Sequence, residues 1–210
     1  LSSFNTNNGV KMNSMFYNCQ KLRTINFGNF FTTSSVKDMS YMFYNCSSIT
    51  SLNLSHFITS KVINMRYMFD SCIALESLYI DNFNTAKVIS MANMFNGCLK
   101  LKEINGELDT RCVEDMNSMF GNCQSLIILN LTNKFDTSLV TDMSYMFSFC
   151  YSLKSLNISN LNTTKVQTME NMFYNCTNLI SINLQSFIIQ STTALNEMLY
   201  GYNNYGRYVL

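Results

Sequence analysis

The chain has 210 residues, of which 47% are hydrophobic and 13% charged, and its formal net charge is +1. The hydrophobic fraction excludes extensive disorder, and the near-neutral charge argues against nucleic acid as a partner, because nucleic-acid-binding surfaces are strongly basic. A single histidine leaves little scope for metal or triad chemistry. No apolar run reaches the length of about 18 residues that a membrane-spanning segment needs.

A unit of about 26 residues repeats along the whole chain. Each copy carries a Met-Phe pair, a methionine three residues before the pair and a cysteine three residues after its phenylalanine. The pairs are Met15-Phe16, Met42-Phe43, Met68-Phe69, Met94-Phe95, Met119-Phe120, Met146-Phe147 and Met172-Phe173. The cysteines are Cys19, Cys46, Cys72, Cys98, Cys123, Cys150 and Cys176. Leu195, Met198, Leu199 and Tyr202 form a degenerate eighth copy.

The first half of each unit has the spacing of an amphipathic helix of about three turns. In residues 36–46 the apolar positions are Val36, Met39, Met42, Phe43 and Cys46, which lie on one helical stripe. A threonine three residues before the valine is placed as an N-cap. These threonines are Thr33, Thr59, Thr85, Thr110, Thr137 and Thr163. Asp38, Glu114, Asp115 and Asp142 would then lie in first helical turns, where negative charge is favourable.

The second half of each unit alternates with period two, which predicts a short strand, as in residues 52–54 and 156–158. One strand and one helix in every unit predict an α/β fold of the leucine-rich-repeat-like solenoid type. We expect about eight coils in one solenoid over residues 1–210, with parallel strands on one face. We also expect the solenoid to be part of a longer chain.

The run from residue 42 to residue 65, MFYNCSSITSLNLSHFITSKVINM, resembles the repeat of the BspA-like leucine-rich-repeat family. This resemblance extends over nearly the whole chain and implies a cell-surface or secreted protein that functions in adhesion without enzymatic activity. The pattern departs from the family at Gly106, which replaces the last strand leucine. The unit is also one residue short there, and the next has an extra residue near Asn133 and Lys134. A local irregularity is therefore expected.

The cysteines and methionines are interpreted as core residues. Thiols at one repeat position behave as small buried hydrophobes, and no Cys-x-x-Cys pair suggests a metal or redox site. Cys112 lies outside this series, near a predicted helix N-terminus where thiolates are favoured. The sequence also contains no common nucleotide-binding or hydrolase motif. We therefore predict no enzyme activity, no cofactor and no metal site.

The best binding candidate is the outward face of the strands, which we call the strand face. Its predicted residues lie between the inward leucines or two positions earlier. They are Asn26, Ser51, Asn53, Ser77, Tyr79, Glu103, Asn105, Ile128, Asn130, Ser155, Asn157, Ser181 and Asn183. Tyr79 and Ile128 interrupt the polar rows and are the expected anchors, because tyrosine is enriched at binding hot spots. The alternative is a solvated face with stacked asparagines that hold the coils together.

Two further groups of residues are surface candidates. Tyrosines recur at two positions of the predicted helix: Tyr41, Tyr67 and Tyr145 at one, and Tyr17, Tyr44 and Tyr174 at the other. Six possible glycosylation sites occur at Asn45, Asn53, Asn130, Asn157, Asn162 and Asn175. The chain has 29 asparagines, and about a fifth of its residues are serine or threonine, so about six such sites are expected by chance. Their number therefore does not indicate secretion.

Three functional hypotheses remain. The first is an extracellular or cell-surface protein that binds a protein or glycan through the strand face. The second is a structural coat or fibre component that associates with copies of itself. The third places an enzyme or toxin domain elsewhere in a longer chain, with these repeats as its targeting arm.

Overall fold

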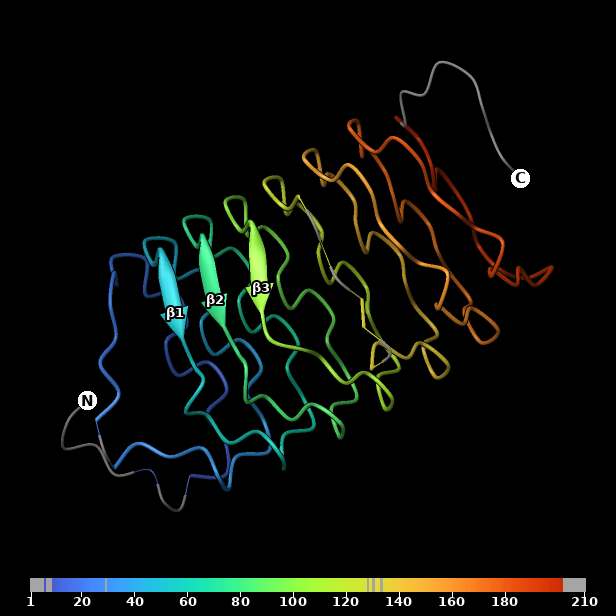
Figure 1. The fold of residues 1–210 in the computed structure, drawn as a ribbon. Helices are drawn as coiled ribbons and strands as arrows, with labels where there is room; N and C mark the ends of the chain where they lie inside the picture. The colour runs from blue at the N-terminus through green and yellow to red at the C-terminus, as the bar shows by residue number, and fades with distance from the viewer. Residues whose placement is uncertain are drawn as a thin grey trace.

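The computed structural model describes Thr6 and residues 9–28, 30–127, 129, 131–132 and 134–201. Similar coils stack side by side along one axis, from the blue coils at one end to the orange and red coils at the other (Figure 1). Among the described residues, strands β1 (Ser51–Asn53), β2 (Ser77–Tyr79) and β3 (Glu103–Asn105) form one parallel sheet in chain order. The predicted solenoid of stacked coils is confirmed.

The strands pair in a register that repeats the sequence period. Ser51 pairs with Ser77, which pairs with Glu103, and Asn53 pairs in the same way with Tyr79 and Asn105. A second row of parallel bridges crosses the stack on another side of the coils. It joins Lys11, Asp38, Asn64, Ser90, Asp115, Asp142, Thr168 and Ala194 in turn. Equivalent positions of successive units therefore lie next to one another.

The predicted helices are wrong: no helix is present in the described part of the chain. The segment from Met39 to Cys46 is a chain of tight turns in which Tyr41 and Asn45 have positive φ angles of 58° and 53°. Two such residues recur four positions apart in each coil, and left-handed residues interrupt a right-handed helix. Chained turns also repeat every three or four residues, so the apolar spacing did not distinguish them from a helix.

The hydrogen bonds show why turns fit a stack of coils. The N–H groups of Met39, Tyr41 and Phe43 donate to carbonyl groups of the next coil, at 3.0, 3.0 and 2.9 Å. Between them, the N–H groups of Met42 and Tyr44 donate to carbonyl groups three residues back in their own coil. A helix would satisfy these groups internally. Here half of them bind the neighbouring coil, so this side of the stack is also held together by the backbone.

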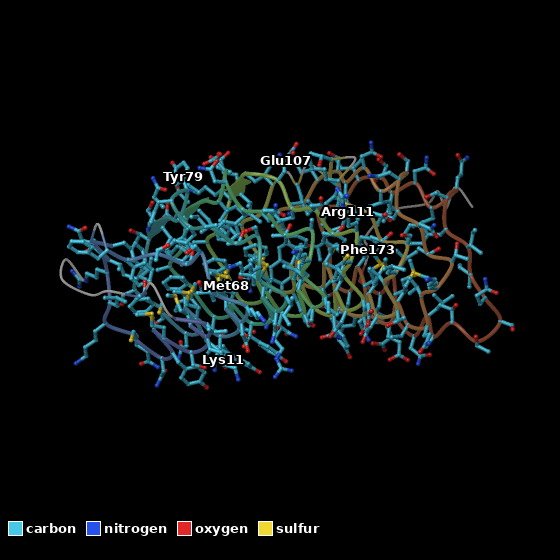
Figure 2. The ribbon with its side chains drawn as sticks, turned by 90° about the horizontal axis from the view of Figure 1, so that it is seen from below. Lys11, Met68, Tyr79, Glu107, Arg111 and Phe173 are labelled. Atoms are coloured by element: carbon cyan, nitrogen blue, oxygen red, sulfur yellow. The ribbon has the colours of Figure 1, made fainter. Side chains whose placement is uncertain are left out.

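The core is a set of columns in which each side chain lies over its equivalent in the next coil. The rings of Phe43, Phe69, Phe95, Phe120, Phe147 and Phe173 are fully buried and stacked, with centroids 5.5–5.6 Å apart. The two methionines of each unit are buried beside them from Met39 to Met172. Figure 2 shows Met68 and Phe173 inside the stack, among the sulfur atoms that run along its interior. The prediction that methionine and phenylalanine form the core is confirmed.

The threonines that stand three residues before the valine of each unit do not cap helices. Instead, each buried threonine hydroxyl binds the backbone of the next coil. The Thr59 hydroxyl, for example, donates to the carbonyl oxygen of Asn84 at 3.0 Å and accepts from the Asn84 N–H at 2.7 Å. The acidic residues assigned to first helical turns are also placed differently, since Asp38 and Asp142 accept N–H bonds from Ser40 and Ser144 two residues on. Polar side chains thus close turns and join coils.

Asn122 provides a test of the turn geometry. Its φ is 55°, and its N–H donates to the Ser148 carbonyl at 2.7 Å. We expect Asn122→Val to lower the free energy of unfolding by about 1–2 kcal/mol, because a β-branched side chain is strained in this conformation. Asn122→Gly should change it little, since glycine adopts this conformation readily. Urea denaturation followed by circular dichroism measures both, and equal losses in the two variants would contradict the assignment.

Candidate functional site

The structure places the predicted strand-face residues in two adjacent columns. Of the eleven that are described, nine are exposed, while Ser77 and Asn105 are half-buried. The exposed residues are Asn26, Ser51, Asn53, Tyr79, Glu103, Ser155, Asn157, Ser181 and Asn183. Ile128 and Asn130 lie outside the described residues, so only Tyr79 of the two expected anchors is placed. Tyr79 is 39% exposed and lies, with Glu107, along one edge of the view in Figure 2.

The asparagine side chains of this face bind within their own coils. The Oδ1 atoms of Asn53, Asn157 and Asn183 accept N–H bonds from the residue two positions on, at 3.0–3.1 Å. This geometry closes a turn at the end of each strand segment. These amides therefore shape the coil that carries them, whereas the stacked arrangement considered from the sequence would join different coils.

The possible glycosylation sites differ in exposure. Asn53, Asn157 and Asn162 are exposed, whereas Asn45 and Asn175 are half-buried, and Asn130 lies outside the described residues. The Asn45 amide also donates to Asn18 at 2.6 Å. The three exposed asparagines are thus the accessible acceptors among those described, and their modification stays a prediction.

A cavity of about 440 Å³ opens beside β3, at the position where the leucine pattern fails. Leu54 and Ile80 occupy this repeat position in the preceding coils and are fully buried. Gly106 takes their place with a φ of 131°, and a Cβ atom on it would lie 2.8 Å from the carbonyl carbon and oxygen of Ile80. Because the backbone passes so close, no larger side chain fits. We call this space the Gly106 cavity; its walls are Glu103, Ile104, Asn105, Gly106, Glu107, Leu108, Phe120, Leu129, Leu131, Thr132 and Phe135.

One polar atom in the wall of the Gly106 cavity lacks a partner. The Nδ2 atom of Asn105 is buried and makes no hydrogen bond with any residue that the structure describes. An unpaired buried donor costs about 1–3 kcal/mol, and such groups are uncommon in folded proteins. The cavity wall therefore mixes polar residues, among them Glu103, Asn105, Glu107 and Thr132, with apolar ones such as Leu108 and Phe135.

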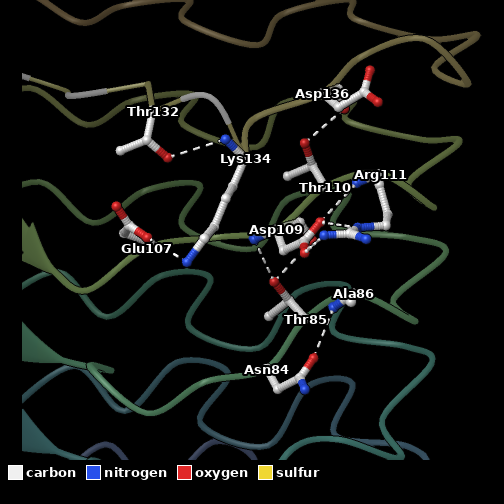
Figure 3. A network of polar contacts seen from close by, with 10 residues as sticks. All are labelled: Asn84, Thr85, Ala86, Glu107, Asp109, Thr110, Arg111, Thr132, Lys134 and Asp136. Carbon is white, nitrogen blue, oxygen red and sulfur yellow. Dashed lines mark hydrogen bonds and ion pairs between the residues drawn. The ribbon is translucent and has the colours of Figure 1, made fainter.

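A second, charged hollow shares Gly106 and Glu107 with the cavity and continues past Asp109, Arg111 and Lys134. Figure 3 shows its two ion pairs: Arg111 binds both carboxylate oxygens of Asp109, at 2.9 and 2.6 Å, and Lys134 lies 2.7 Å from Glu107. The Arg111 hydrogen bonds lower the pKa of Asp109 below its ordinary value. The charged side chains of this second hollow are thus paired with one another.

The tyrosines form a separate stacked cluster at the other side of the coils. The rings of Tyr41 and Tyr67 lie parallel with centroids 4.7 Å apart, and those of Tyr17 and Tyr44 lie 4.8 Å apart. Arg66 lies 5.7 Å from the centre of the Tyr41 ring. Because ring faces contact one another, this cluster offers few open aromatic faces to a ligand.

Six of the seven repeat cysteines are free thiols buried in the core, as predicted, whereas Cys19 is half-buried. Their sulfur atoms also act as donors: Cys98 Sγ lies 3.1 Å from the Phe69 carbonyl oxygen, and the equivalent contact recurs from Cys46 to Cys176. Burial raises the pKa of Cys46 and Cys176 to about 12. Cys112 is half-buried, and because the described part of the chain contains no helix, the dipole argument for its reactivity does not hold.

Sequence reasoning located the irregular coil but missed the site that it creates. Gly106 and the extra residue near Lys134 were visible signals. The roles of Leu129, Leu131 and Phe135 as cavity walls, and of Asn105 as an unpaired donor, depend on how two coils diverge and had no signal of their own.

The described residues contain no group of three or more His, Cys, Asp or Glu residues that could hold a metal ion. They also include no helix long and apolar enough to cross a membrane.

Comparison with known families gives a match along nearly the whole chain. The family described as "Mycoplasma protein of unknown function, DUF285" matches residues 1–54, 47–133 and 105–208. No curated protein matches the sequence.

Two solved structures that are similar to this chain are bacterial leucine-rich repeat proteins. One from Eubacterium ventriosum has a TM-score of 0.55 at 19% identity and covers 92% of this chain and 49% of its own. One from Bacteroides ovatus has a TM-score of 0.45 at 20% identity, covering 90% and 56%. The chain therefore spans about half the length of these proteins. The first supports the leucine-rich-repeat fold inferred from the BspA-like resemblance.

Proposed function

We propose that this chain, which belongs to DUF285, the family of Mycoplasma proteins of unknown function, is a non-enzymatic binding protein of the cell surface. Its strand face would bind a protein or glycan outside the cell. The non-enzymatic role and the surface location follow from the BspA-like resemblance, and the leucine-rich-repeat fold agrees with both.

One observation carries the binding proposal: over β1, β2 and β3 the strand face is polar, and an exposed aromatic residue lies in it. The fixed register of β1, β2 and β3 places Asn53, Tyr79 and Asn105 side by side. Tyr79 presents a large amphipathic side chain among small polar neighbours, and such residues carry much of the energy of interfaces. The Gly106 cavity opens beside the same sheet.

Self-association is the second candidate. An apolar hollow of about 400 Å³ near the end of the described stack is lined by Leu184, Phe187, Leu195, Met198 and Leu199, among others. Exposed Ile188 and Ile189 follow Phe187 in the chain. Apolar surface of this kind favours association with another protein surface, including a second copy of this chain.

Binding to an array of extracellular proteins and defined glycans tests the proposal. We expect saturable binding to at least one spot, and a loss of about tenfold or more in affinity for Tyr79→Ser, because a central tyrosine commonly contributes 1–2 kcal/mol or more. Tyr145→Ser is the matched control, since Tyr145 is 43% exposed on the turn segment rather than the strand face. Including the protein itself as a spot measures self-association directly.

Two results would contradict a binding role of the strand face. One is the absence of saturable binding to every spot. The other is an equal loss in the Tyr79 and Tyr145 variants, which would indicate non-specific tyrosine contacts. Binding to the protein's own spot alone would instead favour the self-associating candidate.

A further inference from the structure

Exposed apolar side chains gather on the side of the coils that carries the second row of parallel bridges. Val10, Lys37, Ile63 and Ile89 occupy one repeat position in four successive coils, and N–H to carbonyl bonds of 2.8–2.9 Å join their backbones in turn. Each of them directly precedes a member of the bridge row. Val10 is 48% exposed, Ile63 44% and Ile89 45%. Single exposed aliphatic residues are ordinary, but neighbouring ones indicate a contact surface.

Two lysines lie beside this row. Lys61 and Lys87 stand two residues before Ile63 and Ile89, and the valine between each pair is fully buried. Alternating exposure in a segment that leads into a parallel bridge places the lysine and the isoleucine on the same outer side. We call this surface the Ile63 patch; its residues are Val10, Lys37, Lys61, Ile63, Lys87 and Ile89.

The lysines of the Ile63 patch are not neutralised within the described part of the chain. No ion pair there includes Lys37, Lys61 or Lys87. Lys61 and Lys87 occupy the same repeat position in adjacent coils, and like charges at such positions repel each other. An anionic partner would remove this repulsion.

Residues 1–100, which contain the patch, are basic. They hold eight lysines and arginines against four acidic residues, whereas residues 101–210 hold six against nine. The four acidic side chains also have partners of their own: Asp38 binds Ser40, Asp70 binds Ser71, Glu76 binds Lys102 and Asp81 binds Ser55. Glu114 follows Ile89 in the row and bounds the patch. The patch therefore favours a negatively charged partner.

The aliphatic residues decide among negatively charged partners. An acidic polysaccharide would pair with the lysines but leave Ile63 and Ile89 in water. A membrane with anionic phospholipids provides phosphate groups for the lysines and, just beneath them, hydrocarbon for the isoleucines. Lysine side chains are long enough to reach the headgroups while the shorter isoleucines enter the boundary of the hydrocarbon. A flat partner of this kind needs no pocket, and none of the hollows described above is lined by patch residues.

We propose that the Ile63 patch binds the surface of a membrane that contains anionic phospholipids, with its lysines at the phosphate groups and its isoleucines at the edge of the hydrocarbon. This inference goes beyond the proposed function and does not depend on it. Lys11, the first residue of the bridge row, lies at the edge of the view opposite Tyr79 in Figure 2. A chain bound in this way would turn the strand face away from the membrane and leave it open to a partner.

Co-sedimentation of the whole chain with lipid vesicles tests the proposal. We expect the chain to bind vesicles that contain phosphatidylglycerol at least about tenfold more tightly than vesicles of phosphatidylcholine alone, because each lysine near an anionic surface strengthens binding about fivefold. Raising the salt concentration should weaken this binding, since salt screens exposed charges.

Paired lysine variants test the charged part of the patch. Lys61→Gln combined with Lys87→Gln should weaken binding to the anionic vesicles about twentyfold. Lys21→Gln combined with Lys100→Gln is the matched control, because it removes the same charge at exposed positions outside the patch. The control should bind within about twofold of the parent chain.

Paired isoleucine variants separate a membrane from a soluble anion. Ile63→Ser combined with Ile89→Ser should weaken vesicle binding about tenfold and leave elution from a heparin column unchanged, because heparin offers charge without hydrocarbon. Ile73→Ser combined with Ile127→Ser is the matched control, since these residues are 43% and 45% exposed outside the patch. Equal denaturation midpoints by circular dichroism show that the variants remain folded.

Equal binding to the two kinds of vesicle, or binding to neither, would overturn the proposal. A loss as large in a control pair as in the corresponding patch pair would also overturn it. Full vesicle binding by the Ile63 and Ile89 variant would assign the lysines to a soluble anion instead of a membrane. An acidic protein that binds through Lys61 and Lys87, in the absence of vesicle binding, would assign the patch to that protein.

Discussion

Raising the pH from 8 to 11 should unfold the protein steeply, beginning just above pH 9. The cause is the column of buried thiols Cys46, Cys72, Cys98, Cys123, Cys150 and Cys176. Burial raises the pKa of each above its ordinary value of 9, to about 12 for Cys46 and Cys176. A thiol that stays protonated in the fold and ionises in the unfolded chain stabilises the fold below pH 9. That stabilisation is lost as the pH rises towards the folded-state pKa.

The expected size of this effect is large because the thiols act together. Each one lowers the free energy of unfolding by about 1.4 kcal/mol for every pH unit above 9. Six of them acting over two units exceed the total stability of about 5–15 kcal/mol that is usual for a protein domain. Urea denaturation at a series of pH values, with a reductant present, measures the slope.

Removing one buried thiol tests whether the cysteines cause the slope. Cys98→Ala should make the dependence of unfolding free energy on pH shallower by about 1.4 kcal/mol per unit, whatever its effect at neutral pH. The matched comparison, Cys112→Ala, removes a half-buried thiol that lies outside the column. An identical slope in the Cys98 variant would assign the alkaline transition to tyrosine and lysine instead.

Thr85→Val should lower the free energy of unfolding by about 2–4 kcal/mol. The Thr85 side chain is fully buried, and its hydroxyl donates to the Asp109 carbonyl at 2.9 Å and accepts from the Asp109 N–H at 2.7 Å (Figure 3). Valine has nearly the same shape but leaves both backbone groups without this partner, and each unpaired group costs about 1–3 kcal/mol. Chemical denaturation measures the loss.

Thr85→Ser is the informative control. Serine keeps the hydroxyl and removes one methyl group, which should cost only about 1 kcal/mol. The Asp109 amide should also exchange its hydrogen faster in the valine variant than in the serine variant, because its acceptor is missing. If serine were as destabilising as valine, packing of the methyl group rather than the hydrogen bonds would hold the coils together here.

Much of the fold could be predicted from the spacing of a few residue types. Phe43, Met42 and Cys46 face inwards as expected, because inward positions are set by burial of apolar side chains whichever backbone connects them. The helix prediction failed because turns and helices share a period of three to four residues. Asn45 and Gly97, both with positive φ just before a cysteine, were the sequence signal for turns.

The candidate site, like the fold, could be predicted from the sequence only in part. The columns through Asn53 and Tyr79 were predictable, since strand residues alternate between faces. The hydrogen-bond partner of each asparagine side chain was not predictable, because the backbone N–H two residues on competes with partners in the next coil. The Gly106 cavity depends on a contact between Gly106 and Ile80, which are 26 residues apart, and pattern alone gives no distance between them.

The coil that contains Gly106 also breaks the translational symmetry of the stack. Successive coils repeat the same buried phenylalanine and cysteine contacts, so their cores are nearly equivalent from one coil to the next. Gly106 and the ion pair of Glu107 and Lys134 make one coil distinct from its neighbours. A single glycine therefore gives an otherwise regular stack one coil that differs from all its neighbours.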